Sequence, residues 1–451
     1  MDATGYSWQI RVIGCGECGA KIASIFNKKP SFLPRRTEDI YPVRSAIVDT
    51  DRSVIDVVQR KEWGWQSEED IHILPVASSS VLASRIVGGS NNIVDGEKRG
   101  TMENRIDSSK GIGGFPYLGR VSAEEVLLTN TAERDAFKAK LIERGFIYGG
   151  LLTINSLSGG TGTGFSQVVS NFLLSEFFTA RMNLNLSIIP EGTKLPQSYP
   201  NNMLYSLYHL LKDERIDGII LADNDVLFRK YGCKGNYAYN SFLHEMLAPI
   251  FLAPSGKFSV AAFDSVLDGH DIRRALRPKI AVDLPELCAI GFASKNLPSS
   301  IGLTLNRGQA RTAYLHTFFE QLVEQVCAST STGEVAKAKS GLALLCGPPN
   351  FFRNTLDNKS EYFSYLWECL INKISPQFRL AALEFEGMKK VQLVTLLSGT
   401  SSSKLTKLFS EALRPYDGLP LAETLGQSIR KIDKQVIEDL MVKEIRQNLL
   451  D

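Results

Sequence analysis

The first stretch of the chain that could carry chemistry is VIGCGECGAK, from Val12 to Lys21. Its residue types suit four kinds of site: a C-x-x-C metal or redox site, a dinucleotide-binding G-x-G-x-x-G turn, a P-loop, or the first phosphate turn of another nucleotide-binding fold. Each kind of site needs particular neighbours, so the surrounding sequence discriminates between them.

Two of these interpretations fit the neighbours poorly. A metal or redox site on Cys15 and Cys18 lacks a second ligand pair, because the chain has no other C-x-x-C, no C-x-x-H and only five scattered histidines. A P-loop needs a lysine directly after its last glycine and then a hydroxyl, but Ala20 precedes Lys21 and Ile22 follows it. We expect the two cysteines to be small packed side chains.

The dinucleotide fingerprint is matched by Gly14, Gly16 and Gly19, and the next strand ends in an acid, Asp49. That acid lies about thirty positions beyond the turn, where about twenty is usual. An NAD(P)-dependent oxidoreductase is therefore one alternative, and it predicts no further phosphate-binding loop.

Two more glycine-rich loops are present. LSGGTGTGF, from Leu157 to Phe165, opens a helical run, and KGIGGFPYLGR, from Lys110 to Arg120, precedes the helical stretch SAEEVLL. Glycines let backbone amides approach phosphate oxygens, threonines add hydroxyl donors, and a helix N-terminus attracts negative charge. Several such loops together predict a polyphosphate ligand.

Six β-rich runs alternate with helical stretches between Gln9 and Tyr231. They are QIRVI, SAIVD, IHIL, GLLTINS, NLNLSII and DGIILAD, and polar or glycine-rich turns follow most of them. This rhythm predicts an α/β fold with a doubly wound sheet, in which ligands collect at the carboxyl ends of the strands.

A connector helix is expected next, interrupted by Pro249 and closed by Pro254 and Gly256. Beyond it, runs such as PKIAVDL, ELCAIGFAS, GLALLCG and KKVQLVTLLS predict a second, α+β domain, and apolar residues spaced by about 3.6 predict a docking C-terminal helix. We therefore divide the chain into a nucleotide-binding domain, a connector helix, an α+β domain and a C-terminal helix, at residues 1–235, 236–254, 255–413 and 414–451.

The composition excludes some classes of function. The 451 residues are 43% hydrophobic, and 51 Lys and Arg against 49 Asp and Glu leave a net charge of +2. Because no broad positive field is present, direct nucleic-acid binding is not expected. No apolar run approaches the roughly 18 residues that span a bilayer, and the start lacks a secretion signal, so we expect a cytoplasmic protein without membrane insertion.

The loop SGGTGTG, from Ser158 to Gly164, resembles the signature loop of the tubulin/FtsZ superfamily, with serine where glycine is commonest. The opening turn GCGECGAKIA is similar to the first glycine turns of FtsZ and tubulin, and GIGGFPYLGR to the FtsZ loop that meets the γ-phosphate. YPVRSAIVDTD, DGIILADNDVLFRKY and YNSFLHEM look closest to TubZ-type plasmid-segregation proteins. The similarity covers most of the chain, most strongly to about Ser265.

The resemblance implies a protein that binds GTP and GDP, hydrolyses GTP and assembles head to tail into filaments. The residues that it assigns to the α- and β-phosphates are Gly16, Glu17, Cys18 and Gly19, then Gly159, Gly160, Thr161, Gly162 and Thr163 of the signature loop. It assigns Gly113 and Gly114 to the γ-phosphate. Asn224 and Asn240 match positions that recognise guanine, a task that suits an amide because it offers a donor and an acceptor side by side.

Glu17 requires a cation if it lies among phosphates, because a carboxylate repels them. Either Glu17 binds Mg²⁺, through water, or its side chain points away.

In this superfamily, acidic residues after the connector helix position the attacking water on the nucleotide of the neighbouring subunit. Where FtsZ-like members carry asparagine and two aspartates, this chain has Ser259, Ala261 and Asp264. Positioning a water contributes roughly 10²–10⁴ in rate, so we expect slow hydrolysis with Asp264 as the catalytic acid. The alternatives are that Asp268 substitutes for Asp264, or that Asp264 caps the next helix.

The expected partner is a second copy of the chain. TubZ proteins dock a DNA-bound adaptor through a basic tail, whereas residues 430–451 contain five basic and five acidic residues. An adaptor is thus only a candidate partner, and division or cell shape fits as well as plasmid segregation. A filament that binds nucleotide without hydrolysing it is the alternative from the structural class.

Overall fold

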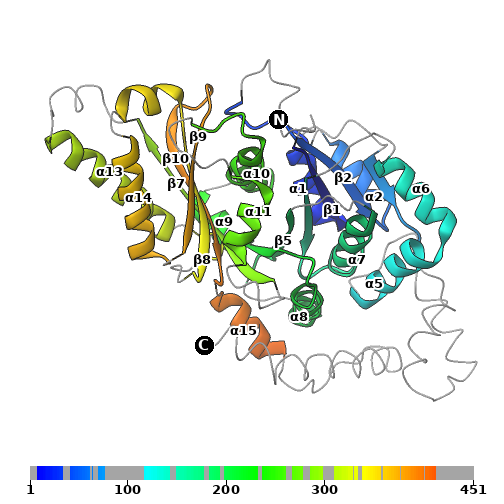
Figure 1. The fold of residues 1–451 in the computed structure, drawn as a ribbon. Helices are drawn as coiled ribbons and strands as arrows, with labels where there is room; N and C mark the ends of the chain where they lie inside the picture. Colours follow the sequence, from blue (N-terminus) through cyan, green and yellow to red (C-terminus); the bar gives the residue numbers. More distant parts are fainter. Residues whose placement is uncertain are drawn as a thin grey trace, which may run out of the picture.

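The computed structural model of the chain describes residues 8–33, 41–60, 63, 70–76, 116–142, 149–176, 182–192, 198–231, 236–260, 267–277, 285–297, 309–328, 330–333, 338–356, 359–375, 377–400 and 402–412. Figure 1 shows a sheet that crosses the molecule, with helices on both of its faces.

The described strands form one ten-stranded sheet with the order β3-β2-β1-β4-β5-β6-β7-β10-β8-β9. They are β1 (Ile10–Cys15), β2 (Val43–Asp49), β3 (Ile71–Ile73), β4 (Gly150–Ser156), β5 (Met182–Ile189), β6 (Gly218–Asp223), β7 (Glu286–Asn296), β8 (Ser340–Gly347), β9 (Phe378–Glu384) and β10 (Lys390–Ser398). Neighbours from β3 to β7 are parallel, β10 is antiparallel to both β7 and β8, and β8 and β9 are parallel.

All six strands expected in the first half of the chain are confirmed as β1 to β6. Every residue of β1, β5 and β6 is buried, as expected for parallel strands that are covered on both faces. Because these strands are parallel, their carboxyl ends share one edge of the sheet. The turns after β1, β2, β4, β5 and β6 therefore lie along that edge.

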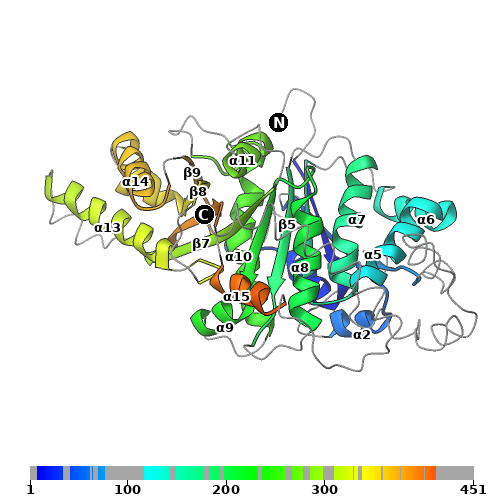
Figure 2. The ribbon, with the colours of Figure 1, turned by 90° about the horizontal axis from the view of Figure 1, so that it is seen from below.

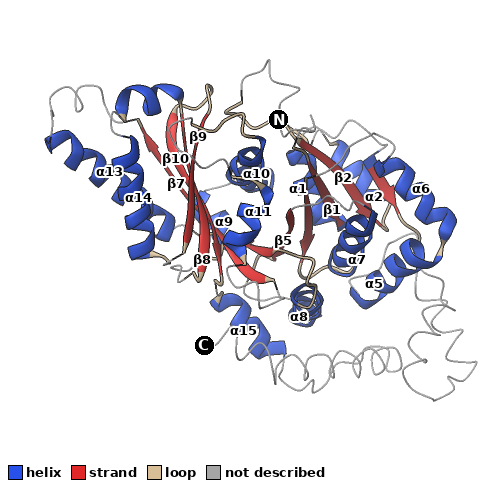
Figure 3. Cartoon of the chain, viewed as in Figure 1, coloured by secondary structure: helices blue, strands red, loops and turns tan. Residues whose placement is uncertain are grey.

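The helices cover both faces of this sheet, as Figure 3 shows. They are α1 (Gly16–Phe26), α2 (Ser53–Gln59), α5 (Pro116–Glu124), α6 (Thr131–Ile142), α7 (Thr161–Glu176), α8 (Ser198–Leu211), α9 (Asn224–Tyr231), α10 (Asn236–Leu252), α11 (Gly269–Leu276), α13 (Gln309–Ala328), α14 (Lys359–Lys373) and α15 (Ser403–Ala412). Shorter π-helical or 3₁₀ turns span Glu125–Thr129, Ala253–Ser255 and Phe351–Thr355. No helix in the described part of the chain is long and apolar enough to cross a membrane.

Alternating side chains of each strand enter different apolar clusters. Ile10 and Val12 of β1 pack in one cluster with apolar residues of α1, α10 and α11, whereas Ile13 packs with apolar residues of α5 and α7 on the opposite face. Residues of α8 and α15 form a third cluster with β6, and Figure 2 shows α15 beside α8. Because successive side chains of a strand point to opposite faces of the sheet, each face is covered by its own set of helices.

The connector helix is confirmed as α10. Pro249 lies inside it, and the 3₁₀ turn Ala253–Ser255 ends at Gly256, whose φ of +67° is left-handed. The indole N–H of Trp8 donates to the carbonyl oxygen of Phe251 over 3.0 Å. Since Trp8 lies two residues before β1, the last turn of α10 lies at the amino-end edge of the sheet, opposite the turns.

The second half of the chain extends the same sheet instead of forming one of its own. Parallel pairing of Gly218 with Glu286 joins β6 to β7, and the unpredicted strand β9 lies at the far edge. The run PKIAVDL and residues 414–451 lie outside the described residues, and the domain boundaries stay a prediction.

Candidate nucleotide site

The glycine turns after β1 and β4 contact each other. Gly16, the first residue of α1, has a φ of +71°, which favours glycine. A Cβ atom on Gly16 would lie 2.8 Å from the backbone nitrogen of Gly162, and one on Gly162 would lie 2.6 Å from the carbonyl oxygen of Cys15. Neither position has room for a side chain, so the two backbones meet in one corner, which we call the phosphate corner.

The other glycines of the opening turn pack α1 onto β4. A Cβ atom on Gly14 would lie 2.4 Å from the carbonyl oxygen of Gly19, and one on Gly19 would lie 2.3 Å from the carbonyl oxygen of Ile154. Close helix–strand packing is what the last glycine of such a turn provides. The helix N-terminus is thereby held at the carboxyl end of β4.

The signature loop leads directly into α7. The Thr163 hydroxyl donates to the carbonyl oxygen of Ser156 over 2.7 Å. The Asn202 side-chain amide donates to the carbonyl oxygen of Ser158 over 2.8 Å. A Cβ atom on Gly159 would have no atom within 4 Å. The first N–H groups of a helix have no partner within it and attract anions, and α7 presents these groups beside the open space at Gly159.

A third turn, after β2, reaches the same corner. The Thr50 and Thr161 hydroxyl oxygens are 2.9 Å apart. Asp49 accepts the N–H groups of Thr50 and Asp51 on its Oδ1 atom, over 2.7 and 3.2 Å, and is 3% exposed. Its carboxylate is thus turned into its own loop, which weakens the oxidoreductase interpretation, where this acid would bind a ribose.

The electrostatics of the phosphate corner are unusual for an anion site. Burial raises the pKa of Asp49 to about 6, and the charges of Asp51 and Glu17 add to the effect. Glu17 is exposed at its side chain and pairs with Lys21, with 2.5 Å between Oε1 and Nζ. Burial also raises the pKa of the Cys18 thiol to about 12, so Cys18 is a neutral packed side chain.

The third glycine loop is described only from its end. Gly113 and Gly114 lie outside the described residues, but α5 begins at Pro116, earlier than expected from the sequence. A Cβ atom on Gly119 would lie 2.8 Å from the carbonyl oxygen of Gly160, and one on Gly164 would lie 2.2 Å from that of Pro116. The start of α5 therefore packs directly on the signature loop.

Two asparagines expected to recognise guanine lie at the start of α9 and on the connector helix. Asn224 begins α9 directly after β6, and Asn240 lies near the start of α10 and is 3% exposed. The Oδ1 atom of each is buried and has no hydrogen-bond partner among the described residues. Burying a polar atom without a partner costs about 1–3 kcal/mol, so each Oδ1 atom is an acceptor that a ligand donor could satisfy.

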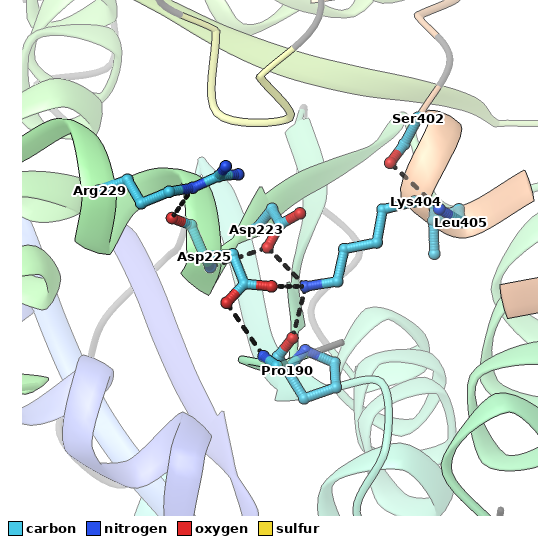
Figure 4. A network of polar contacts seen from close by, with 8 residues as sticks. Pro190, Asp223, Asp225, Arg229, Ser402, Lys404 and Leu405 are labelled. Atoms are coloured by element: carbon cyan, nitrogen blue, oxygen red, sulfur yellow. Dashed lines mark hydrogen bonds and ion pairs between the residues drawn. The ribbon is translucent and has the colours of Figure 1, made fainter. Parts of the chain in front are cut away.

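The turn that carries Asn224 is held by charged side chains, drawn in Figure 4. Asp223 precedes Asn224 and Asp225 follows it, and the Lys404 ammonium of α15 contacts both carboxylates. Lys404 also donates to the carbonyl oxygen of Pro190, in the segment after β5. Three segments that are far apart in the sequence thus meet beside Asn224.

The expected catalytic segment is described at its two ends. Asp264 and Ala261 lie outside the described residues. Ser259 pairs with Leu383 of β9 in an antiparallel bridge. Asp268 is the N-cap of α11, accepting the Asp271 N–H over 2.8 Å, so the alternative in which Asp264 caps this helix is wrong.

A comparison with protein families identifies the region that contains these turns. A family model described as Tubulin/FtsZ family, GTPase domain, matches residues 9–232. The chain therefore contains a GTPase domain of the tubulin/FtsZ family. The matched residues run from β1 through α9. They include the turns after β1, β2 and β4 and Asn224.

Solved structures of the tubulin/FtsZ superfamily align over nearly the whole chain. A protofilament of CetZ2 from Haloferax volcanii with bound GTPγS has a TM-score of 0.62 and 17% identity, covering 94% of this chain and 99% of the other. CetZ from Methanosaeta thermophila has a TM-score of 0.60 and 15% identity, covering 98% and 96%. A GTPγS-form protofilament of TubZ from Bacillus thuringiensis has a TM-score of 0.55 and 15% identity, covering 96% of each chain.

These alignments confirm the tubulin/FtsZ fold, and at 15–17% identity they show the fold alone. The special likeness to TubZ-type proteins stays a prediction. A search of curated proteins found no match.

Two features of this candidate site were not predicted from sequence. Thr50 follows a strand as an ordinary turn residue, and only its contact with Thr161 places it in the site. Lys404 is one lysine in the run SSSKLTKLF, and its partners precede it by 179 and 181 positions. The acidic pair around Asn224, in the motif DND, was the available signal, since two neighbouring carboxylates, one of them buried, favour a cation between them.

Proposed function

We propose that this chain is a cytoskeletal GTPase that binds GTP and GDP, hydrolyses GTP and assembles head to tail. The unpaired Oδ1 atoms of Asn224 and Asn240 carry the proposal. Guanine presents an amine at C2 and an N–H beside it, which are donors that two acceptor oxygens can satisfy, whereas adenine lacks that amine.

The spacing of the strands fits a nucleotide. The phosphate corner lies at the carboxyl end of β4, and Asn224 lies at that of β6, two strands away. Neighbouring strands are about 4.8 Å apart, so the two positions are separated by about 10 Å. A ribose and its phosphates bridge such a span, which supports a nucleotide that lies across the ends of β4, β5 and β6.

The proposed contacts follow from this orientation. The phosphates lie against the turn Gly16–Gly19 and the start of α7 from Gly159 to Thr163, and Gly113 and Gly114 complete the γ-phosphate side. Because the Thr163 hydroxyl already donates to Ser156, its backbone N–H is the group left for phosphate.

Mg²⁺ is the proposed counter-ion, with Glu17 as the residue that would hold it through water. The charges of Glu17 and Asp51 both act on the buried carboxyl group of Asp49, and phosphates cannot approach such a group of acids without compensating positive charge. Lys21 supplies one positive charge, at 2.5 Å from Glu17, and a bound Mg²⁺ would supply the remainder.

The positions of the two halves of the active site favour assembly. The nucleotide lies at the carboxyl-end edge of the sheet, while the last turn of α10 lies at the opposite edge, beside Trp8. In the sequence, the segment that contains Asp264 follows this turn, between Ser259, which bridges to Leu383 of β9, and Asp268, the N-cap of α11. Stacking of copies along the same axis would bring this part of one copy to the nucleotide of the next, and the CetZ2 and TubZ structures above are protofilaments.

Hydrolysis is proposed to be slow, with Asp264 positioning the water on the neighbour's nucleotide. Ser259 and Ala261 supply no carboxylate. Asp268 is a weaker candidate than its position suggested, because its Oδ1 atom accepts the Asp271 N–H in a capping box.

The test is sedimentation of the purified chain with GTP, GDP or GTPγS, with phosphate release measured on the same samples. We expect pellets with GTP and GTPγS, none with GDP, and slow phosphate release with GTP only. Pellets that ignore the nucleotide would contradict the assembly proposal. Pellets without phosphate release would favour the non-hydrolysing filament.

Asp264→Ala gives the second arm of this test. The variant should retain pelleting with GTP, release phosphate more slowly and disassemble later than the wild type. A phosphate release rate equal to that of the wild type would remove Asp264 from the mechanism.

The oxidoreductase alternative has its own test. A change in NADH absorbance when the wild-type chain is mixed with a substrate would favour that alternative.

The cellular role proposed is that of a cytoplasmic filament in plasmid segregation, division or cell shape. An adaptor protein is a candidate partner only for the first of these. Fluorescent tagging in the host, with plasmid retention and cell outline recorded together, would distinguish the three roles.

A further inference from the structure

The Lys404 ammonium contacts three oxygen atoms around the turn that carries Asn224. Its Nζ atom lies 2.8 Å from the carbonyl oxygen of Pro190, 2.9 Å from Asp223 Oδ1 and 2.5 Å from Asp225 Oδ2, as Figure 4 shows. An ammonium group has three N–H donors, so this geometry uses all of them. The side chain is 20% exposed and Asp223 is 3% exposed, which limits screening by solvent.

The helix that carries Lys404 is fixed in place. The Ser402 hydroxyl accepts the Leu405 N–H at the start of α15, which is the contact of an N-cap. Leu405 and Leu408 are buried in a cluster with apolar residues of α8 and β6. The ammonium group is therefore presented from a packed helix, and holding it in place costs little further entropy.

The two acids that Lys404 contacts hold the backbone around Asn224. Asp223 Oδ1 accepts the Asp225 N–H over 2.9 Å, which closes the turn in which Asn224 lies. Asp225 Oδ1 accepts the N–H of Gly192 over 3.0 Å, and Gly192 has a φ of +104°. The turn after β6 and the segment after β5 are thus tied together through the carboxylates that Lys404 neutralises.

Charge balance shows why the lysine is needed. Burial raises the pKa of Asp223 although Lys404 opposes the rise, while Lys404 and the Gly192 N–H outweigh burial and lower the pKa of Asp225. Without Lys404, two carboxylates on either side of Asn224 would repel each other in a poorly solvated turn. The turn would relax, and the amide of Asn224 would leave its present orientation.

We propose that Lys404 is a positioning residue for guanine recognition, which acts through Asp223 and Asp225 to hold the Asn224 amide toward the base. The inference rests on the proposed function. It makes α15, near the end of the described chain, part of the nucleotide site at a distance of about 180 positions from the residue that it orients.

The test is titration of the full chain with fluorescent GDP and fluorescent IDP, at protein concentrations where no pellet forms. IDP lacks the guanine C2 amine, so the ratio of the two Kd values measures base recognition. Lys404→Met should weaken GDP binding roughly tenfold, the lower end of the loss found when residues that orient metal ligands are replaced, and should bring the GDP and IDP affinities close together.

Two further variants show whether the effect passes through Asn224. In the Asn224→Ala background, Lys404→Met should add almost nothing to the loss. Lys404→Arg, which keeps the charge, should recover part of the GDP preference. Lys373→Met is the matched control, because Lys373 forms a 2.8 Å ion pair with Glu324 between α13 and α14, and its GDP affinity should equal that of the wild type.

The outcomes separate the inference from the proposed function. Wild-type protein that does not bind GDP overturns both. Wild-type protein that binds GDP, with unchanged affinity in Lys404→Met, overturns this inference alone. If Lys404→Met weakens GDP and IDP binding equally, and this loss adds to that of Asn224→Ala, Lys404 has only a structural role. That result would also overturn the inference. If Lys404→Met does not fold, Asp225→Asn, which removes the closer carboxylate, is judged by the same criteria.

Discussion

At the phosphate end of the site, turns that follow β1, β2 and β4 meet through backbone atoms and threonine hydroxyls. At the base end, Asn224 depends on side chains and segments from much later in the chain, among them Lys404 and Ser331, whose carbonyl oxygen accepts the Asp223 N–H over 2.9 Å. The first end needs only that neighbouring parallel strands pair correctly. The second needs the whole chain to fold. Substitutions in the second half of the chain should therefore weaken recognition of the base more than binding of the phosphates.

The largest effect is expected where the two glycine backbones meet. Gly162→Ala would place a Cβ atom 2.6 Å from the Cys15 carbonyl oxygen, and backbone atoms cannot move aside cheaply. We expect a loss of about 3 kcal/mol in the free energy of unfolding, measured by urea denaturation. Gly159→Ala is the matched control in the same loop, because its Cβ atom would meet nothing within 4 Å. Equal losses in both variants would contradict the close contact.

At the base end, a substitution should weaken nucleotide binding without lowering the stability of the nucleotide-free protein. Asn240→Ala removes a buried oxygen that has no partner in the described structure, so the nucleotide-free protein should be no less stable than the wild type. The same variant should bind GDP roughly thirtyfold more weakly, about 2 kcal/mol. Calorimetric titration and thermal unfolding measure the two quantities. A variant that loses stability but keeps its GDP affinity would show that Asn240 serves the fold only.

A pH effect should appear at the phosphate end. Because the pKa of Asp49 is raised from 3.8 to about 6 in the folded chain, the native state holds this proton more tightly than the unfolded state. The associated stability is fully present below about pH 4 and is lost as pH rises through 6. Asp49→Asn keeps an oxygen for the Thr50 N–H and removes the charge.

The nucleotide-free Asp49→Asn variant should therefore exceed the wild type in stability at pH 7.5, by an amount on the order of 1–2 kcal/mol. The difference should vanish near pH 4. Urea denaturation at the two pH values measures it, and a difference that does not depend on pH would mean that Asp49 is not the titrating group.

The smallest effect concerns the exposed pair of Glu17 and Lys21. Such pairs contribute about 0.5 kcal/mol or less to stability, so Lys21→Met should leave the unfolding midpoint nearly unchanged. GDP affinity should fall about two- to threefold at low salt, because the Glu17 charge is then uncompensated, and the loss should shrink at high salt. A loss that persists in high salt would indicate direct contact between Lys21 and the ligand.

The sequence predicted the phosphate end better than the base end for a physical reason. Glycines such as Gly16 and Gly162 mark backbone contacts that belong to turns next to strands, and the strands themselves show as apolar runs. The role of Lys404 depends on partners brought together only by the complete sheet, and no local pattern encodes it. Asp268 likewise became recognisable as the helix cap only once the start of α11 was known.

The second half of the chain shows the same contrast. β7, β8 and β10 were expected from their apolar runs, whereas β9 was missed because FRLAALE alternates too weakly to be told from a helix. The prediction of a second, α+β domain did not anticipate that β6 and β7 pair directly. Long-range strand pairing is decided by tertiary packing, which a single sequence does not display.

The central claim is that the phosphate corner and the two amides bind one guanine nucleotide. Calorimetric titration of the nucleotide-free chain with GDP, and with ADP under the same conditions, tests it most directly. The account predicts saturable binding of one GDP per chain and no comparable binding of ADP. Equal affinity for the two nucleotides, or no heat with either, would contradict it.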